Sequence, residues 1–530
     1  MKPTVNHTLA AASLAALIGI SAQSGPAVAQ TPAPRASGSP SVVREPAPPA
    51  TPDSVTRHAM SIDGRSYEYT ARAGTITLRN RKEEPTARVF YTAYTLEGDP
   101  ATRPVTFIYN GGPGSSTMWL RMGSIGPVRV VAADAAPSGP PPYTIVENKY
   151  SLLDKSDLVF IDMPASGFGR IFGAGTPKMF FGVDQDGAAF DQFIKRYVTA
   201  FKRWNSPKFL FGESYGTARS AVLAKLLMDD GVALNGIVLL SSILNFGLDY
   251  GNGDPIAGGD WPYVFYLPTE AATAWYHNKL PNKPASLRAF LANAEAFAMG
   301  DYLDALAQGD RLSAAGRAAI IHRLSGFLGI SEQYVRNANL RVHYGRFEQE
   351  LLRSDGIIVG RLDGRYQTYS VDRGAQETAW DPTFSSIDAP YTTAINQYVR
   401  VDLNYDTPLE YRPDIYGMLQ EPGNTGGVPD QSLWDSSHNK RWPTNVAPDL
   451  AEVMTQNPTL RVFSANGYYD FATPYFGTVY TLKHLNLAPA LQKNISFGFY
   501  QSGHMVYLDE PSLAQFKHDL AGWYDAALAR

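Results

Sequence analysis

The sequence predicts an α/β fold in which a mostly parallel central sheet, with helices on both faces, is interrupted by a large inserted cap. β-branched and aromatic runs alternate with helical segments up to about residue 245, and the alternation returns after about residue 430, as expected for βαβ units. The run Asp157–Asp162 is apolar inside and is followed by Pro164, which is typical of a buried parallel strand. Between these parts the alternation is lost.

The individual elements follow from these patterns. Residues 56–245 and 431–530 are expected to form the two parts of the core, and residues 246–430 the cap. Strands are predicted at 66–71, 75–78, 89–94, 104–109, 157–162, 208–211, 236–240, 460–464 and 495–500, and helices at 184–204, 217–228, 261–278, 286–307 and 513–527. In a parallel sheet of this kind the active site lies at the carboxyl ends of the strands.

Composition narrows the function classes. The chain has 530 residues, of which 44% are hydrophobic and 18% charged, values typical of a large globular protein. Its formal net charge of −4 provides no overall positive field for binding nucleic acid. Because there are no cysteines, disulfides, thiolate metal sites and a cysteine nucleophile are excluded.

The first 29 residues have the layout of a secretory signal peptide. Lys2 precedes an apolar run of 12 residues (9 to 20), and Ala27–Ala29 provides a small-residue cleavage site. A membrane anchor is the alternative, but a span needs roughly 20 apolar residues. We therefore expect cleavage after Ala29, a bacterial protein that is periplasmic or secreted, and no stable membrane insertion. Residues 30–55 are rich in proline and alanine, which predicts a flexible linker.

The strongest local motif is Gly212–Gly216, which fits G-x-S-x-G between a predicted strand and a predicted helix. In the α/β-hydrolase fold this context places a serine on a tight turn, with its hydroxyl exposed at the top of the sheet. Ser214 is therefore the predicted nucleophile. The alternative is an ordinary turn in which Ser214 caps the following helix.

A serine nucleophile needs a histidine base and an acid that orients it, in the chain order Ser, Asp or Glu, His. Of nine histidines, His504 stands on a loop directly after a predicted strand. Asp470 follows the strand before it and satisfies the order. The competing residues are His438 for the base, and Asp449 and Asp509 for the acid. Without a catalytic role, His504 is a surface-loop histidine and Asp470 a turn residue.

The glycine-rich run Asn110–Ser116 also follows a predicted strand. Its backbone N–H groups are free to converge on one point, as an oxyanion hole requires. We expect the amides of Gly112 and Tyr215 to form this hole. A phosphate cradle is disfavoured because the Lys-Ser/Thr ending of a P-loop is missing, and a plain turn is the remaining alternative. No metal-binding spacing or cofactor motif stands out.

Together these motifs resemble those of the serine carboxypeptidase family. The matching stretches are Asn110–Ser116, Asn148–Ser151, Phe160–Pro164 with Gly167 and Phe168, Gly212–Gly216, Gly467 with Asp470, and Gly503–Met505. The resemblance implies an α/β-hydrolase fold, a Ser214–Asp470–His504 triad, and hydrolysis of C-terminal peptide bonds through an acyl-enzyme without a cofactor. It also implies that Asn110 and Glu213 bind the substrate's terminal carboxylate.

The chain departs from the family pattern around that carboxylate site. Ser124 stands where the family usually has a second glutamate, Ile108 replaces a tryptophan, Ser115 replaces a cysteine, and Tyr468 stands where an aspartate is common. We expect Glu213, without a carboxylate neighbour, to ionise more easily than in the family, which moves the pH optimum towards neutral. An esterase or acyltransferase with the same triad is the alternative function, and an inactive binding protein of this fold is a third.

Overall fold

The computed structural model describes residues 47–49, 51–248, 259–416 and 434–529. The predicted signal peptide and most of the predicted linker lie outside these residues. The linker prediction extends to residue 55, whereas strand β1 (Ser54–Ile62) already begins at Ser54. The chain is drawn into the sheet there because β1 pairs antiparallel with β2 (Arg65–Arg79) along its whole length.

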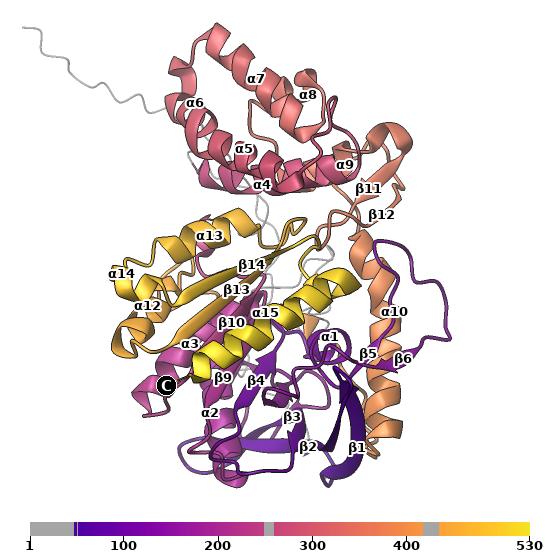
Figure 1. Ribbon diagram of the computed structural model, residues 1–530, viewed down its shortest axis with the longest axis vertical. Helices are drawn as coiled ribbons and strands as arrows, with labels where there is room; N and C mark the ends of the chain where they lie inside the picture. The colour runs from indigo at the N-terminus through magenta and orange to yellow at the C-terminus, as the bar shows by residue number, and fades with distance from the viewer. Residues whose placement is uncertain (1–46, 50, 249–258, 417–433, 530) are drawn as a thin grey trace, which may run out of the picture. The chain divides into compact units, whose positions relative to one another are not determined.

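A single sheet of ten strands runs through the described core (Figure 1). Three antiparallel strands lead into six parallel ones. The strand order is β1, β2, β3 (Pro85–Leu96), β7 (Asp157–Ile161), β4 (Val105–Tyr109), β9 (Lys208–Glu213), β10 (Gly236–Leu240), β13 (Arg461–Gly467) and β14 (Ile495–Tyr500), and β8 (Arg170–Ile171) pairs with β3 off this path. The prediction of a mostly parallel sheet in an α/β-hydrolase fold is confirmed.

Two details of the strand prediction were wrong. The strands expected at 66–71 and 75–78 are one strand, β2, which continues through Gly74. A Cβ at Gly74 would lie 2.2 Å from Oδ1 of Asp53, so the glycine allows the close approach of the chain. Strand β1 was not predicted at all, because it follows directly on the proline-rich segment.

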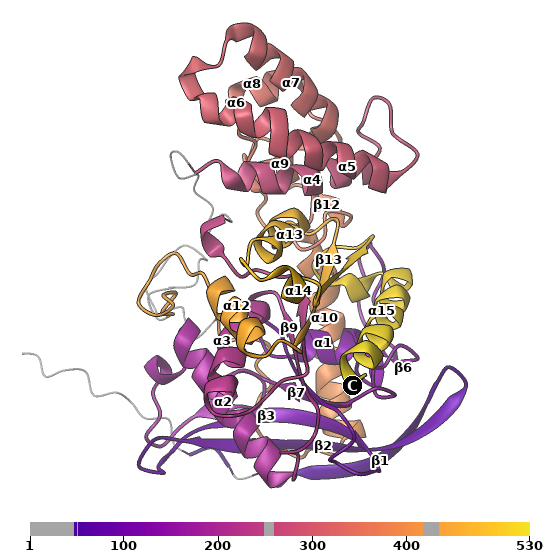
Figure 2. The same cartoon turned by 60° about the vertical axis from the view of Figure 1, so that its left-hand side comes forward.

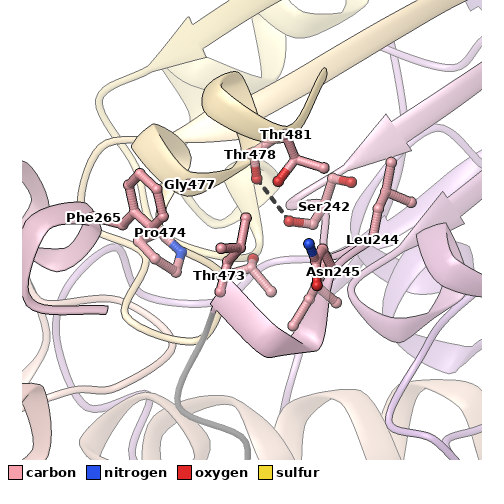
Figure 3. Close-up of a pocket in the computed structure, with 11 residues that line it drawn as sticks. Ser242, Leu244, Asn245, Phe265, Thr473, Pro474, Gly477, Thr478 and Thr481 are labelled. Atoms are coloured by element: carbon pink, nitrogen blue, oxygen red, sulfur yellow. Dashed lines mark hydrogen bonds between the residues drawn. The ribbon is translucent and has the colours of Figure 1, made fainter. Parts of the chain in front are cut away.

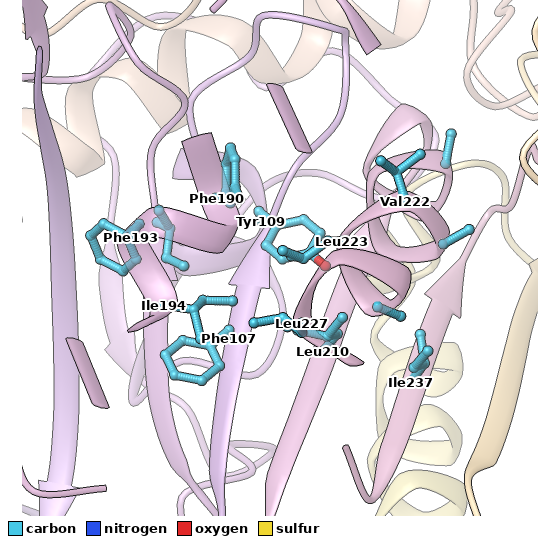
Figure 4. Close-up of a cluster of buried hydrophobic side chains, with 14 of the residues drawn as sticks. Phe107, Tyr109, Phe190, Phe193, Ile194, Leu210, Val222, Leu223, Leu227 and Ile237 are labelled. Carbon is cyan, nitrogen blue, oxygen red and sulfur yellow. The ribbon is translucent and has the colours of Figure 1, made fainter. Parts of the chain in front are cut away.

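Each face of the sheet carries its own layer of helices. On one face, α2 (Val183–Ala200), α3 (Tyr215–Asp229) and α12 (Ala447–Gln456) share a buried cluster with the strands. Figure 4 shows this cluster, in which Phe107, Tyr109 and Leu210 of the sheet meet Phe190 and Leu223 of the helices. Burial of each such side chain contributes about 1.5–3 kcal/mol. The opposite face is covered by α1 (Met118–Gly123), α10 (Pro382–Gln397) and α15 (Glu510–Leu528).

The inserted region forms a helical layer (Figure 2), and its buried cluster also includes Tyr469, Phe471 and Tyr475 from the segment after β13. Its helices are α4 (Trp261–Tyr276), α5 (Leu287–Phe297), α6 (Leu303–Gln308), α7 (Ala314–Leu328), α8 (Glu332–Asn337) and α9 (Tyr344–Glu350), followed by the small pair β11 (Ile357–Val359) and β12 (Gln367–Tyr369). The helix expected at 286–307 is broken by a π-helical turn at Ala298–Tyr302, where Gly300 has non-helical backbone angles. Ser286 begins the helix by accepting a hydrogen bond from the amide of Ala289, as an N-cap does.

Not all of the predicted cap lies in that layer. Helix α10 falls within the expected cap range, yet it packs on α1 of the core: the rings of Tyr391 and Trp119 are 5.1 Å apart. The insertion therefore leaves the core after β10 and returns to it at α10, before the last two strands. Among the described residues, no helix is long and apolar enough to cross a membrane.

Candidate active site

Ser214 stands on a tight turn between β9 and α3. Its backbone φ of 60° and ψ of −131° lie in a region that non-glycine residues rarely adopt. Gly212 makes the turn possible, because a Cβ there would lie 2.2 Å from the carbonyl oxygen of Gly216. The amide of Ser214 is bonded to the carbonyl of Leu240 at 2.9 Å, which fixes the turn to the end of β10.

Asp470 and His504 form a hydrogen-bonded acid–base pair just beyond the ends of β13 and β14. Oδ2 of Asp470 lies 2.8 Å from Nδ1 of His504, and the two residues are only 1% and 4% exposed. The other carboxylate oxygen, Oδ1, accepts the amides of Ala472 and Thr473 at 2.8 and 2.9 Å. These bonds hold the carboxylate in one orientation, so Nε2 of His504 is the nitrogen left for proton transfer.

Hydrogen bonds also connect this pair to the Ser214 turn. The carbonyl of His504 accepts the hydroxyl of Ser241 at 2.6 Å, and Ser241 follows directly on β10. The carbonyl of Leu240, the residue before Ser241, accepts the amide of Ser214. The serine and the histidine therefore belong to neighbouring loops on one edge of the sheet. The three residues proposed for the triad thus lie on neighbouring loops at one edge of the sheet.

The competing residues have other partners. His438 lies between two carboxylates, with Nδ1 2.6 Å from Asp184 and Nε2 3.0 Å from Asp449. The pKa of His438 is raised, because hydrogen bonds to these carboxylates outweigh its partial burial. Asp509 caps α15 by accepting the amide of Ser512 at 2.9 Å. We assign structural roles to His438, Asp449 and Asp509.

The glycine-rich loop after β4 packs directly against the Ser214 turn. A Cβ at Gly111 would lie 2.5 Å from the backbone nitrogen of Tyr215, so only glycine permits this approach. Gly112 has a φ of 110°, and Tyr215 is the first residue of α3, where helix amides have no intrahelical acceptor. The amides of Gly112 and Tyr215 therefore lie on adjacent segments of chain, as an oxyanion hole needs.

Asn110 and Glu213 form a buried pair at the same edge. Nδ2 of Asn110 donates to Oε1 of Glu213 at 2.6 Å, and Oδ1 of Asn110 accepts the amide of Leu120 at 3.0 Å, which fixes the direction of the amide group. Oε2 of Glu213, the hydroxyl of Tyr507 and the hydroxyl of Ser124 are buried, and no described group forms a regular hydrogen bond with any of them.

Burial and neighbouring charges set the protonation states of this site. Burial raises the pKa of Glu213 to about 7, against opposing effects of His504, Tyr507 and Asn110. Burial alone would lower the pKa of His504, but the charge and hydrogen bond of Asp470 outweigh it, so the pKa of His504 is raised. The negative charge of Glu213 also favours the protonated histidine. The titrations of Glu213 and His504 are thus coupled.

A small hollow adjoins the acid–base pair (Figure 3). It is enclosed by residues 242–245 after β10, by Phe265 of α4 and by α13 (Tyr475–Lys483). Thr473 belongs both to this wall and to the pair, because its hydroxyl lies 2.8 Å from Oδ2 of Asp470 and 3.2 Å from Nδ1 of His504. In the described parts of the chain, no group of three or more His, Asp or Glu side chains is placed to hold a metal ion.

Several residues of the site were missed from the sequence. Thr473, Tyr507 and the segment 361–365 carry no motif, although Thr473 is only three residues from Asp470. A threonine three residues after an aspartate at a strand end is a weak signal for such a contact. Tyr507 is likewise three residues after His504, whereas residues 361–365 are brought to the site by the tertiary fold alone.

The first part of the core is similar in sequence to a known protein family. Residues 67–249 match the model of the serine carboxypeptidase family. This matched segment covers less than half of the chain. It contains Asn110, Gly112, Glu213, Ser214 and Tyr215, whereas Asp470 and His504 lie outside it.

Two curated relatives each match somewhat more than a third of this chain. A serine carboxypeptidase-like protein of Arabidopsis thaliana is 27% identical over 188 residues, covering 34% of this chain and 37% of that protein. A pheromone-processing carboxypeptidase of Yarrowia lipolytica is 26% identical over 217 residues, covering 38% of this chain and 33% of that protein. The chain thus spans about a third of the length of the curated relatives it matches.

Similarity of structure extends further than similarity of sequence. The crystal structure of a prohormone-processing carboxypeptidase from Saccharomyces cerevisiae superposes with a TM-score of 0.52 at 15% identity, covering 86% of this chain and 92% of that one. At this identity the superposition shows the α/β-hydrolase fold and nothing about the reaction.

Proposed function

We propose that this protein is a serine-type carboxypeptidase, which hydrolyses C-terminal peptide bonds through an acyl-enzyme on Ser214. The observation that carries the proposal is the arrangement at one sheet edge of the strained Ser214 turn, the hydrogen-bonded Asp470–His504 pair and the buried Asn110–Glu213 pair. The first two elements provide an activated nucleophile. The third provides polar groups for a substrate carboxylate.

The residues support a two-step reaction. Nε2 of His504 takes the proton of the Ser214 hydroxyl as its oxygen attacks the scissile carbonyl, and Asp470 stabilises the imidazolium that forms. The amides of Gly112 and Tyr215 bind the oxyanion. His504 then passes its proton to the departing amine, which leaves as the C-terminal amino acid. Water attacks the acyl-enzyme by the same route, releasing the shortened peptide and restoring Ser214.

A protonated Glu213 explains how a carboxyl beside the nucleophile accepts an anionic substrate. Because its pKa is about 7, Glu213 is neutral in mildly acidic solution. The protonated carboxyl then donates a hydrogen bond to the substrate carboxylate, which the charged form would repel. Asn110 and the hydroxyl of Tyr507 are the donors beside Glu213. We propose that the tyrosine offsets the missing second glutamate.

The proposal is tested by trapping the acyl-enzyme. Purified protein without residues 1–29 is mixed with a peptide ester, quenched in acid and digested, and the peptide that contains Ser214 is weighed by mass spectrometry. An acyl adduct on Ser214, formed together with a burst of leaving group, is the expected result. Turnover that persists in Ser214→Ala overturns the proposal. Absence of labelling by a fluorophosphonate in the folded protein would instead favour an inactive binding protein.

An esterase or acyltransferase is the second candidate, and the observation that favours it is Ser124 in place of a second glutamate. The same acyl-enzyme passes its acyl group to water or to an alcohol. Product analysis with a blocked amino-acid ester in the presence of an alcohol separates the two functions. Transfer that exceeds hydrolysis at low alcohol concentration supports this candidate.

We also propose that the protein is exported, as residues 1–29 indicate, and that it is bacterial, because the exported chain contains no cysteine for disulfides. Expression of the full chain in a bacterium, followed by N-terminal sequencing of the product outside the cytoplasm, tests the export. A mature product beginning at Gln30 is expected. A product that retains residues 1–29 would contradict cleavage.

A further inference from the structure

Residues 361–365 of the insertion, here called the brace, lie between the loops that carry Asp470 and His504. We propose that the brace, through Asp363 and Arg365, positions the acid–base pair for catalysis. This inference rests on the proposed function, since it assigns positioning residues to the same reaction. Asp363 and Arg365 act through other residues and do not touch the reacting atoms.

The brace is bonded to the loop that carries Asp470, on both sides of that residue. The amide of Phe471 donates to the carbonyl of Arg361 at 3.0 Å, and the amide of Gly364 donates to the carbonyl of Tyr469 at 2.9 Å. The residues immediately before and after Asp470 are therefore both bonded to the brace. This restricts the position of the Asp470 backbone independently of its carboxylate.

The loop that carries His504 is also bonded to the brace. The amide of His504 donates to the carbonyl of Leu362 at 2.6 Å, and the amide of Gly503 donates to Oδ2 of Asp363 at 3.0 Å. Gly503 has no room for a side chain, because a Cβ there would lie 2.4 Å from both the Leu362 carbonyl oxygen and Cβ of Asp363. Two consecutive amides of the histidine loop are thus fixed.

A buried ion pair gives the brace its stiffness. Asp363 is fully buried and Arg365 is 4% exposed, and the guanidinium is bonded to both carboxylate oxygens, with Nη2 at 2.7 Å from Oδ2. Nη2 also donates to the hydroxyl of Ser502 at 3.2 Å, two residues before His504. Arg365 further lies 3.1 Å from Asp134 and 3.7 Å from Asp509, so its charge is well compensated.

The brace is anchored to the helical layer as well as to the core, since the carbonyl of Gly364 lies 2.7 Å from Nε2 of His277 at the C-terminal end of α4. Asp381, the N-cap of α10, accepts the amides of Arg361 and Leu362 at 3.1 and 3.0 Å. The hydroxyl of Thr383 accepts the amide of Asp363 at 3.2 Å. Because α10 packs on the core, the brace links three parts of the chain that are far apart in sequence. A displacement of about 1 Å at a catalytic group costs roughly 100-fold in rate.

The test compares Asp363→Ala, Asp363→Asn and Arg365→Met with wild type. Asp355→Asn is the control, because Asp355 lies on the same insertion in an exposed ion pair with Lys279. We expect Asp363→Ala to lower kcat roughly 100-fold while KM stays within about threefold. Asp363→Asn keeps an acceptor for Gly503, so its loss is expected to be about tenfold. The low-field proton resonance of the Asp470–His504 hydrogen bond is expected to weaken in the same order.

The outcomes separate the brace from the proposed function. A wild-type kcat in both Asp363→Asn and Arg365→Met would contradict the positioning role of the brace. An equal loss of kcat in Asp355→Asn, or an effect confined to KM, would also contradict it. If Asp363→Ala does not fold, the other two variants decide the question. Turnover that persists in Ser214→Ala defeats the proposed function instead, and the resonance of the Asp470–His504 bond then still reports on positioning.

Discussion

At the scale of single residues, Thr473 joins the two members of the acid–base pair. Its hydroxyl lies within hydrogen-bonding distance of both Asp470 and His504, and its side chain also lines the neighbouring hollow. A hydrogen bond to a charged group contributes about 1.5–3 kcal/mol, so loss of this hydroxyl affects a pair that becomes fully charged during the reaction.

We predict that Thr473→Val lowers kcat about tenfold or more, which corresponds to roughly 1.4 kcal/mol. Valine keeps the shape of threonine but leaves Oδ2 of Asp470 with one donor fewer. Thr478→Val is the matched control, since Thr478 lines the same hollow but donates to the carbonyl of Ser242. Steady-state kinetics with a small ester measure both. Equal rates in the two variants would contradict the role of Thr473.

Glu213 gives the site a predicted pH dependence. Its raised pKa, about 7, means that it carries its proton below this pH and a negative charge above it. We expect KM for free-acid substrates to rise as the pH increases through about 7, because the charged form repels the substrate carboxylate. Simple esters have no carboxylate, and their KM is expected to stay level over the same range.

Glu213→Gln tests this assignment, because glutamine donates a hydrogen bond at every pH. The variant is expected to lose the alkaline rise in KM for free acids while activity with esters persists. On the acidic side both the wild type and the variant are expected to lose activity as His504 becomes protonated, a change that Asp470 favours by raising the pKa of His504. An unchanged pH profile in the variant would rule out Glu213 as the titrating group.

The three residues proposed for the triad could be predicted from the sequence, whereas Asp363 of the brace could not. Ser214, Asp470 and His504 could be proposed because a strand end, a motif and a chain order coincide. Asp363 could not, since it lies 140 residues before Gly503 in the chain and is an ordinary aspartate in sequence. Contacts of this length depend on how the insertion returns to the core, which no local pattern encodes.

At the scale of elements, a buried ion pair supports the loop after β4. Nε of Arg219 in α3 donates to Oδ2 of Asp186 in α2 at 2.7 Å, and Nη1 donates to the carbonyl of Asn110 at 2.7 Å. The guanidinium also lies 4.2 Å from the centre of the Phe190 ring. Both charged side chains are fully buried. The pair thus connects two helices to the glycine-rich loop.

We predict that Asp186→Ala destabilises the protein by about 3–5 kcal/mol, because it leaves a buried guanidinium without its partner. Asp229→Ala is the control, since Asp229 pairs with Lys225 at the surface of the same helix, α3; its expected cost is at most about 0.5 kcal/mol. Urea unfolding followed by circular dichroism measures the difference. Similar midpoints for the two variants would show that the buried pair contributes little.

Element boundaries followed the sequence well where apolar periodicity was strong, as in α3, β9 and β10. They failed where one residue overrides the pattern. Gly74 looked like the end of a strand but lies within β2, and the π-helical turn at Ala298–Tyr302 has no clear signal in sequence. Because glycine has no side chain, the sequence does not indicate whether a strand or helix ends or continues at that residue. The packing of the surrounding chain decides this.

At the scale of the whole molecule, the fold class and the interrupted core were predictable because the alternation of strands and helices stops and restarts. The layout of the insertion was not. Helix α10 leaves the helical layer and packs on the core, and the brace before it reaches the catalytic loops. We infer that the insertion helps to shape the site through the brace, so its sequence is expected to affect kcat as well as substrate choice.

The central claim is that the site selects a free C-terminal carboxylate, and one measurement tests it most directly. It is the ratio of kcat/KM for a blocked dipeptide with a free carboxylate to that for the same dipeptide amide, determined just below pH 7, where a substantial fraction of Glu213 is protonated. We predict a ratio of at least about 10, equivalent to roughly 1.4 kcal/mol, and loss of both activities in Ser214→Ala. A ratio of one or below, with activity still dependent on Ser214, would leave a serine hydrolase but contradict a carboxypeptidase.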